Sequence, residues 1–132
     1  FVWHVGDTRL YKITPTKIEK LTNDHTLIAK ELAEGRITEK NAKKDLRRNV
    51  LLQCIGASGN VKPDMFCGEV KVGDILLLCS DGFRHEVSEK EILRSLGKCD
   101  NHKINEKLKT LISMNLKRRE QDNISVALIK VK

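Results

Sequence analysis

Two aspartates lie at the ends of two apolar runs, and this arrangement most constrains how the chain can fold. Asp81 closes the run Ile75–Ser80, and Asp122 comes just before the run Ile124–Ile129. Runs rich in Leu, Ile and Val predict strands of a covered sheet, so a carboxylate at such a strand end needs a cation or a hydrogen-bond donor. Hard divalent ions such as Mg²⁺ and Mn²⁺ are the usual partners. An Asp beside Gly or Asn, as both of these are, is also typical of a simple turn.

Strands are predicted on both sides of a helical stretch. Short β-rich segments separated by turn residues predict these strands, and the first three of them predict a meander. A turn at Gly73 and Asp74 leads into the strand that ends near Asp81. The predicted strands cover residues 1–5, 10–13, 17–21, 50–55, 65–70 and 75–80, with a last one beginning at Asn123.

Caps and apolar spacing predict four helices. Asp24, Thr38 and Ser88 are expected N-caps, and Ser88 is expected to form a capping box with Glu91. Gly35 is expected to end the first helix. Helices inserted between groups of strands argue for an α+β fold of mainly antiparallel sheets flanked by helices. The predicted helices cover residues 25–34, 39–46, 89–96 and about 104–117.

The composition is typical of one globular piece. The 132 residues are 39% hydrophobic and 33% charged, and no linker-like tract interrupts them, so one unit without an internal boundary is expected. No apolar stretch is long enough to span a membrane, and no secretory signal opens the chain. The four cysteines lack the paired spacing of zinc sites, which favours reduced, structural cysteines and a cytoplasmic location.

The formal charge of +7 raises the question of nucleic-acid binding. The segments 36–48 and 102–119 are rich in Lys and Arg, and basic stretches can neutralise phosphates. No nucleic-acid motif and no aromatic series for base stacking accompanies them, so solvent-exposed helix faces explain the charge more simply. An anionic phosphoprotein would be served by the same charge. Nucleic acid is therefore not the expected partner.

Four blocks in a fixed order resemble those of one enzyme family. They are Val5–Arg9, Leu21–His25, Val72–Gly82 and Gln121–Val126. Together they resemble successive blocks of the type 2C metal-dependent protein phosphatases, in the bacterial serine/threonine branch. Each block alone is short and turn-like, whereas four in order at compatible spacing are a strong signal. The resemblance covers nearly the whole chain.

The resemblance implies a fold and a place within it. The family forms a β-sandwich with helices outside and a metal site at one edge of the sandwich. Residues 1–132 are expected to be the C-terminal portion of a single catalytic domain. The reason is that the family's upstream Asp-Gly pair and its basic phosphate-binding residue have no counterpart in this sequence. Residues 24–48 would correspond to the mobile flap beside the active site of bacterial members.

The resemblance also implies the residues of a metal site. Asp81 and Asp122 would be direct ligands of one ion of a Mn²⁺ or Mg²⁺ pair, shared with the missing upstream Asp. Asp7 would bind a third ion, although its sequence context also suits a plain β-turn. Gly82 would support the site by letting the backbone turn, and Asn123 would fix the loop through hydrogen bonds.

Arg84 and His85 depart from the family pattern. After the Asp-Gly pair, bacterial members often have a small hydrophobic residue followed by Thr-Asp, whereas Phe83, Arg84 and His85 stand here. An Arg and a His next to the metal edge could contact phosphate or donate a proton to the leaving group. A solvent-facing loop is the simpler alternative. The departure is expected to affect substrate preference more than the type of reaction.

The expected reaction is hydrolysis of phosphoserine and phosphothreonine in proteins by a metal-activated water, without a covalent intermediate. The partners would be phosphoprotein substrates and a cognate serine/threonine kinase. This chain alone is expected to be inactive, because the upstream bridging Asp is absent. The alternative is a non-catalytic module that binds phosphoproteins or regulates another protein.

An incomplete sandwich also predicts self-association. Uncovered apolar strands recruit another chain. The expected contacts are the run Ile75–Cys79 and the alternating Phe1, Trp3 and Val5. The fragment is therefore expected to form a non-native oligomer.

Overall fold

The protein consists of two compact units, each built from two separate stretches of chain. The computed structural model describes residues 1–42 and 44–132. Unit 1 contains Phe1–Thr8 and Thr22–Cys67, and unit 2 contains Arg9–Leu21 and Gly68–Lys132. Each unit combines helices with an antiparallel sheet. The predicted α+β class is therefore confirmed.

Four antiparallel strands make the sheet of unit 2. In the order β3-β2-β5-β6, they are Ile18–Lys20, Arg9–Ile13, Ile75–Cys79 and Val126–Lys130. β5 lies inside the sheet, where Leu77 pairs with Tyr11 on one side and with Leu128 on the other. The turn before it is the predicted one, with Gly73 at a φ of 94° and the carboxylate of Asp74 accepting the N–H of Lys71 over 2.9 Å.

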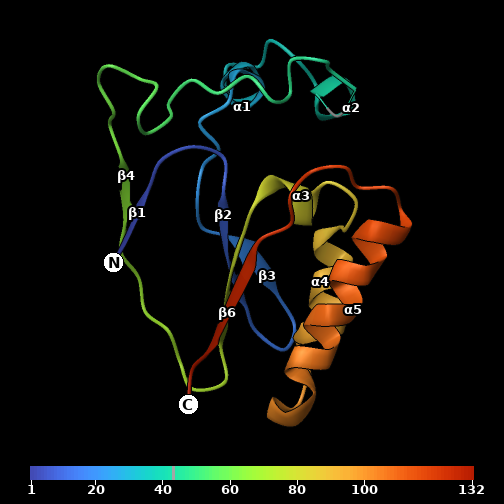
Figure 1. Cartoon of the computed structure of the whole chain (residues 1–132). Coiled ribbons are helices and arrows are strands. Elements are labelled where there is room, and N and C mark those ends of the chain that lie inside the picture. Colours follow the sequence, from blue (N-terminus) through green and yellow to red (C-terminus); the bar gives the residue numbers. More distant parts are fainter. Residues whose placement is uncertain (43) are drawn as a thin grey trace. The chain divides into compact units, whose positions relative to one another are not determined.

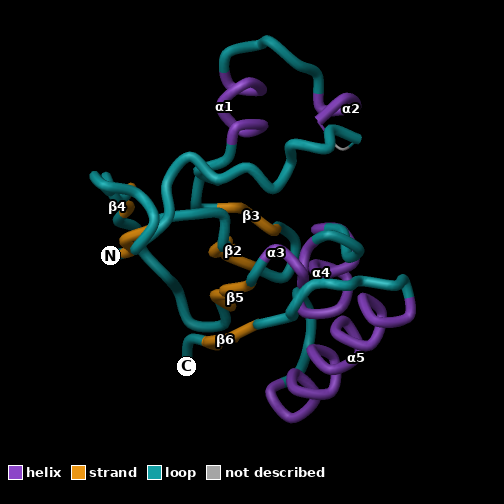
Figure 2. The backbone as a smooth tube through the Cα atoms, turned by 45° about the horizontal axis from the view of Figure 1, so that its top comes forward, coloured by secondary structure: helices purple, strands orange, loops and turns teal. Residues whose placement is uncertain are grey.

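Two helices, α4 (Glu89–Leu96) and α5 (Ile104–Lys117), lie side by side and cover one face of this sheet (Figure 1, Figure 2). A one-turn helix, α3 (Asp81–Arg84), follows β5, and a short 3₁₀ helix, Asn101–Lys103, precedes α5. Alternate residues of β5 point into this layer, so Leu77 is fully buried whereas Leu78 is 43% exposed. The core also contains Tyr11, Ile13, Ile75, Cys79, Phe83, Val87, Ile92, Leu96, Ile104 and Leu111.

The predicted capping box of α4 is present and is extended by an arginine. The side chain of Ser88 accepts the N–H of Glu91, and the carboxylate of Glu91 accepts the N–H of Ser88. Arg118, just after α5, donates to both oxygens of the same carboxylate, over 2.6 and 3.1 Å. The hydrogen bonds from Arg118 and then those from Ser88 lower the pKa of Glu91 to about 2. This cluster fastens α4 to α5.

Unit 1 contains a two-stranded sheet and two short helices. β1 (Val2–His4) pairs antiparallel with β4 (Asp64–Phe66). Helix α1 (Leu27–Ala33) is followed by Gly35 at a φ of 70°, so the predicted helix end is confirmed. Helix α2 (Glu39–Ala42) is shorter than predicted, and Lys43 lies outside the described residues.

Three predictions about the strands and caps of unit 1 are wrong. β1 pairs with β4 and not with β2, so the predicted three-strand meander is reduced to a hairpin of β2 and β3. Thr26, and not Asp24, caps α1 by accepting the N–H of Ala29. The cause is a short ladder in which residues 25–27 exchange backbone hydrogen bonds with residues 50–52. Because of this ladder, helix α1 begins later than predicted. The strand predicted at 50–55 is wrong, since only this short ladder forms there.

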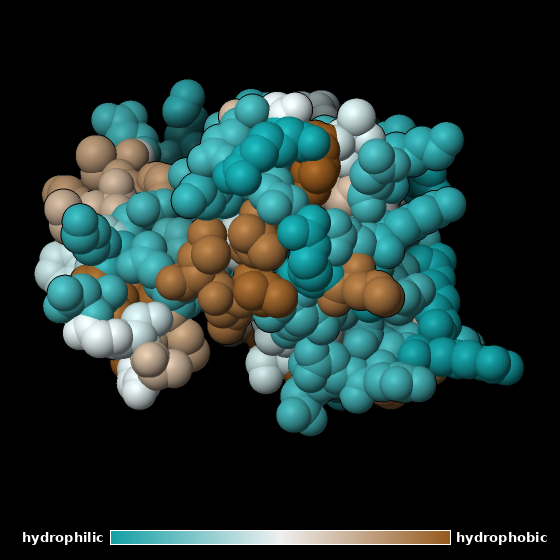
Figure 3. All heavy atoms as spheres, turned by 90° about the horizontal axis from the view of Figure 1, so that it is seen from above, coloured by the Kyte–Doolittle hydropathy of each residue, from teal (hydrophilic) through white to brown (hydrophobic). Residues whose placement is uncertain are grey.

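Large apolar side chains remain exposed in both units, and Figure 3 shows such side chains gathered on one face. The expected exposure in unit 1 is present at Phe1 and Trp3, whereas Val5 is half-buried. In unit 2 the expectation is wrong for the inward residues of β5, which α4 and α5 cover. Self-association stays a prediction. Among the described residues, no helix is both long and apolar enough to cross a membrane.

Candidate metal centre

Asp81 and Asp122 come together because β5 and β6 are neighbours that run in opposite directions. Cys79, the last residue of β5, pairs with Val126, the first residue of β6. Asp81 follows the one strand and Asp122 precedes the other, so both lie at the same end of the sheet. Asp81 is also the first residue of helix α3, which the sequence did not predict.

Ser80 fastens the two segments that carry these aspartates. Its hydroxyl donates to the carbonyl oxygen of Asn123 over 3.2 Å and accepts the N–H of Ser125 over 3.0 Å. Its backbone N–H donates to the carbonyl oxygen of Ser125 over 2.9 Å. Ser80 was not among the predicted site residues. Asn123 was predicted to fix the loop, and its backbone carbonyl oxygen does so through the bond from Ser80.

Gly82 lets the two segments approach closely. Its backbone is helical, so it is not present to permit a left-handed turn. A Cβ at this position would lie 2.5 Å from the carbonyl oxygen of Asn123 and 3.2 Å from Cβ of Asp122. Any side chain there would push the loop away. Gly82 therefore supports the site through its small size.

Three side chains gather at this end of the sheet. Ligand atoms of Asp81, His85 and Asp122 all lie within 4.8 Å of one another. The backbone N–H of the next residue donates to Oδ1 of each aspartate, from Gly82 over 2.9 Å and from Asn123 over 2.7 Å. The side chain of Asp81 is 26% exposed, and Asp122 is exposed. Solvent can therefore reach both carboxylates.

The imidazole of His85 lies between two carboxylates. Its Nε2 is 3.9 Å from Oδ2 of Asp81, and its Nδ1 is 3.4 Å from Oε2 of Glu120. The side chains of His85 and Glu120 are only 15% and 7% exposed. The predicted solvent-facing alternative for His85 does not fit this burial.

Glu120 is a residue of the site that the sequence analysis missed. Its Oε1 accepts the N–H groups of Gln121 and Asp122, over 3.0 and 2.9 Å. Its own N–H donates to the carbonyl oxygen of Asn115 in α5 over 3.1 Å. The only signal in the sequence was its place two residues before Asp122.

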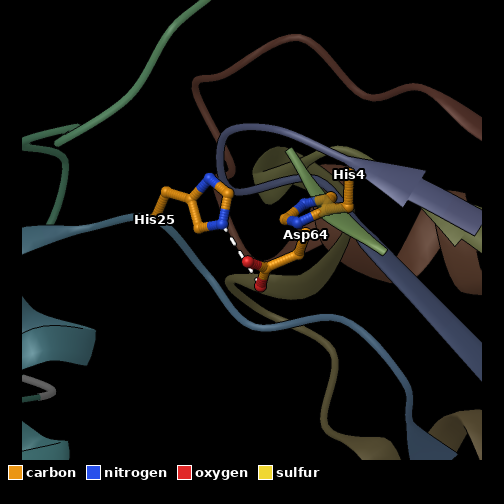
Figure 4. A group of neighbouring side chains, drawn as sticks. All are labelled: His4, His25 and Asp64. Atoms are coloured by element: carbon orange, nitrogen blue, oxygen red, sulfur yellow. Dashed lines mark ion pairs between the residues drawn. The ribbon is translucent and has the colours of Figure 1, made fainter. Parts of the chain in front are cut away.

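A second group of metal-type ligands lies in unit 1. Ligand atoms of His4, His25 and Asp64 lie within 4.8 Å of one another. His4 is the last residue of β1, and Asp64 is the first of β4. Figure 4 shows the ring of His25 facing the carboxylate of Asp64, with Nε2 and Oδ2 3.3 Å apart. The ring centroids of the two histidines are 5.1 Å apart.

Protein groups already occupy three of the four ring nitrogens in this second group. The N–H of Gly6 donates to Nδ1 of His25 over 3.3 Å, so neutral His25 carries its hydrogen on Nε2, toward Asp64. Nε2 of His4 donates to the carbonyl oxygen of Thr8 over 2.7 Å. Nδ1 of His4 is buried, with no hydrogen-bond partner among the described residues. The group reads as a hydrogen-bonded cluster that joins β1, β4 and the segment before α1.

The remaining predicted residues take separate places. Asp7 lies in unit 1, after Gly6 at a φ of 99°, and it belongs to neither group of close ligand atoms in the described part of the chain. Arg84 ends helix α3 in unit 2 and is half-buried. The roles of Asp7 and Arg84 stay predictions.

The donors of unit 2 fit a divalent cation. Two carboxylates are the ligands that Mg²⁺ and Mn²⁺ prefer, and an imidazole adds a ligand suited to transition metals. Opposite ligands of one such ion stand about 4.2 Å apart for bonds of about 2.1 Å. The ligand atoms of the group lie within 4.8 Å of one another, and Nε2 of His85 and Oδ2 of Asp81 are 3.9 Å apart, so their present spacing is close to that of ligands around one ion.

Known proteins resemble the chain in sequence and in fold. The serine/threonine phosphatase stp of Listeria monocytogenes is 35% identical over 130 residues, covering 96% of this chain and 50% of that protein. The solved serine/threonine phosphatase of S. agalactiae has a TM-score of 0.91 and 32% identity, covering 98% of this chain and 53% of that one. The catalytic domain of the phosphatase PstP, solved in complex with two manganese ions, has a TM-score of 0.79 and 30% identity, covering 96% and 50%.

No protein-family model matches the chain. The chain spans about half the length of the curated relatives that it matches. Within that half, the likeness in sequence and fold extends from one end of the chain to the other. On these likenesses, the chain belongs to the type 2C family of bacterial serine/threonine protein phosphatases.

Proposed function

We propose that the whole protein is a metal-dependent phosphatase that hydrolyses phosphoserine and phosphothreonine in proteins. The observation that carries this proposal is the meeting of Asp81 and Asp122 at one end of the sheet, in a chain whose relatives are serine/threonine phosphatases. Phosphoproteins are the proposed substrates, and a cognate serine/threonine kinase is the proposed partner. Cytoplasm is the proposed location, which the four free cysteines favour.

The proposed role of Asp81 and Asp122 is to hold Mn²⁺ or Mg²⁺. Divalent ions bound here would supply a nucleophilic water at neutral pH and offset the negative charge of the phosphate. Ser80 and Gly82 keep the two carboxylates from separating, which matters because a site must be held within about 0.5 Å of its working geometry. Asp7 is proposed as a ligand of a third ion.

Arg84 is the proposed phosphate contact. It follows Asp81 by one turn of helix α3 and can bring a guanidinium to the same end of the sheet. His85 was predicted to share this role. Its ring lies among the carboxylates, so a role at the cation suits it better.

The chain is proposed to be the C-terminal portion of a single catalytic domain, with residues 24–48 as its flap. Side-chain exposure supports the flap assignment, because Leu46 is 99% exposed and α2 buries only Ala42. The upstream portion would supply the remaining ligands. Little or no activity is therefore expected from the 132-residue chain by itself.

The test removes the charge of a proposed ligand aspartate and compares the effect with that of removing the charge of an unrelated aspartate. Release of phosphate from a phosphothreonine peptide is measured for the whole protein with Mn²⁺, with Mg²⁺ and with a chelator. Asp81→Asn and Asp122→Asn are expected to lose about 100-fold or more in rate. Asp100→Asn is the control, because Asp100 is exposed and its side chain makes no capping hydrogen bond to the following 3₁₀ helix.

Two results would contradict the proposal. One is turnover that survives chelation, and the other is an Asp81→Asn or Asp122→Asn protein as active as the Asp100→Asn control. A whole protein that binds phosphopeptide without turnover would support the alternative, a non-catalytic phosphoprotein-binding or regulatory module.

A further inference from the structure

We propose that His85 is a third protein ligand of the divalent cation and that Glu120 is the residue that positions its ring. This inference rests on the proposed function, because it takes Asp81 and Asp122 as the carboxylate ligands. It adds a nitrogen donor to a site otherwise made of oxygen donors. The consequence is a changed metal preference.

The position of His85 relative to Asp81 supports direct binding. The two residues are four apart, and the N–H of His85 donates to the carbonyl oxygen of Asp81 over 3.1 Å, so the helical geometry of α3 continues to His85. Side chains four apart lie on the same helix face. Nε2 of His85 thus faces Oδ2 of Asp81, and its ligand atom also lies within 4.8 Å of that of Asp122.

Glu120 sets which nitrogen of His85 is available. At 3.4 Å, Oε2 of Glu120 is closer to Nδ1 than Asp81 is to Nε2, and a carboxylate can only accept a hydrogen. The hydrogen of neutral His85 is therefore favoured on Nδ1, which leaves the lone pair of Nε2 available on the side of Asp81. Histidine ligands of metals are commonly held this way, with the second ring nitrogen donating to a carboxylate.

Both partners of this arrangement are anchored to the same helix. The side-chain amide of Asn115, fully buried in α5, donates to the carbonyl oxygen of Phe83 in α3 over 2.9 Å. The backbone carbonyl oxygen of Asn115 accepts the N–H of Glu120 over 3.1 Å. Asn115 therefore holds α3 and Glu120 at once, and the ring and its orienting carboxylate keep their relative place.

A nitrogen ligand changes which ions bind. Imidazole suits later transition metals, whereas a site of carboxylates and water suits Mg²⁺ and Mn²⁺, and affinity rises from Mn²⁺ through Co²⁺. With His85 as a ligand, the cation site is expected to favour Co²⁺ over Mg²⁺ more strongly than two carboxylates would. The cluster of unit 1 offers a matched control, because His25 already uses Nδ1 and Nε2 within the protein.

The experiment measures metal binding by the whole protein and does not use turnover. Dissociation constants for Co²⁺ and Mg²⁺ come from calorimetry, and pulsed EPR of bound Mn²⁺ detects coupling to a coordinated ¹⁴N. His85→Gln is expected to weaken Co²⁺ binding about 10- to 100-fold, to change Mg²⁺ binding much less, and to remove the ¹⁴N coupling. His25→Gln is expected to leave all three readings unchanged.

Glu120→Gln tests positioning by removing the charge while keeping the side-chain shape. The variant is expected to weaken Co²⁺ binding by up to about tenfold and to keep a ¹⁴N coupling. Glu120→Asp would restore part of the affinity if charge at Nδ1 is what matters. Thermal unfolding without metal shows whether either buried substitution has instead damaged the fold.

The outcomes separate this inference from the proposed function. If Asp81→Asn weakens metal binding while His85→Gln keeps both the Co²⁺ preference and the ¹⁴N coupling, His85 only forms ion pairs and the inference is wrong. If Asp81→Asn and Asp122→Asn both bind metal normally, the ligand assignment of the proposed function is wrong as well. Loss of the coupling in folded His85→Gln protein, with His25→Gln unaffected, supports the inference.

Discussion

Each of the two units brings histidine and aspartate side chains together, but the hydrogen bonds of the histidine rings differ between the units. In unit 1, Nε2 of His4 donates to Thr8, and both nitrogens of His25 face protein partners. In unit 2, Nδ1 of His85 faces Glu120, and Nε2 points to carboxylates that solvent can reach. Both groups have ligand atoms within the same 4.8 Å.

This difference shows that closeness of ligand atoms is a weak criterion for a cation site. What decides is whether a lone pair stays available after the protein has satisfied its own polar groups. By that criterion the cluster of unit 2 is the stronger candidate for cation binding. The cluster of unit 1 is assigned to stability, because both ring nitrogens of His25 have protein partners and the one lone pair that remains, on Nδ1 of His4, is buried away from solvent. The two roles can be separated by experiments that act on one cluster and leave the other as a control.

The largest expected effect is selective stabilisation of unit 2 by metal. Mn²⁺ at a hundred times its dissociation constant stabilises the state that binds it by about 2.7 kcal/mol. In the whole protein, the backbone amide hydrogens of β5 and β6 are therefore expected to exchange with solvent about 100-fold more slowly when Mn²⁺ is bound than without metal. The exchange rates of amides in β1 and β4 are expected to change little. Equal protection of β1 and β4 would place a cation in the cluster of unit 1 and overturn the comparison.

Gly82→Ala is expected to have the next largest effect. The added Cβ would lie 2.5 Å from the carbonyl oxygen of Asn123, which is backbone and cannot rotate away. Overpacking of this kind costs about 1–3 kcal/mol, and here it also separates Asp81 from Asp122. Chemical unfolding and Mn²⁺ titration should both change. Gly59→Ala is the control, because nothing lies within 4 Å of a Cβ there.

His25→Gln is expected to lower stability without affecting metal binding. The substitution removes the contact between Nε2 and Asp64 and the acceptor for the N–H of Gly6, and a buried group left unsatisfied costs about 1–3 kcal/mol. The unfolding midpoint in urea should fall while the Mn²⁺ affinity stays the same. His102→Gln serves as the control, because His102 is exposed. Weaker Mn²⁺ binding by folded His25→Gln protein would mean that unit 1 also holds a cation.

The elements predicted best are those that depend on residues close together in the sequence. The apolar run of β5 and the capping box of Ser88 with Glu91 depend on adjacent residues, and both are present. The pairing of Val2 with Phe66 could not be predicted, because register between distant segments leaves no local pattern. It was this pairing that removed β1 from the predicted meander.

The candidate site was predictable to a similar degree. The apolar runs identified Asp81 and Asp122, and the family resemblance gave them a shared role. Ser80 and Glu120 act through backbone and ring contacts that only the folded chain creates. Gly82 was singled out for its conformation, whereas the structure shows a close approach of the Asn123 backbone that leaves no room for a side chain.

The smallest expected effect concerns Glu91 of unit 2, whose carboxylate stabilises the packing of α4 on α5 and lies outside the proposed cation site. Hydrogen bonds from Arg118 and then Ser88 lower the pKa of Glu91 from 4.5 to about 2. Because the folded pKa is the lower one, the stabilisation is complete above pH 4.5 and is lost as pH falls toward 2. Arg118 is 40% exposed, so solvent and salt screen the pair and the effect is modest.

Glu91→Gln in metal-free protein should therefore reduce stability at pH 7 and flatten its decline between pH 4.5 and 2. Urea unfolding midpoints across this range, at low and high salt, measure both changes. Other acidic residues titrate in the same window, so the difference in slope between parent and variant is the quantity to compare. Parallel slopes would show that the ion pair joining α4 and α5 adds nothing to acid sensitivity. The acid lability of unit 2 would then have to come from the other carboxylates, including those at the cation site.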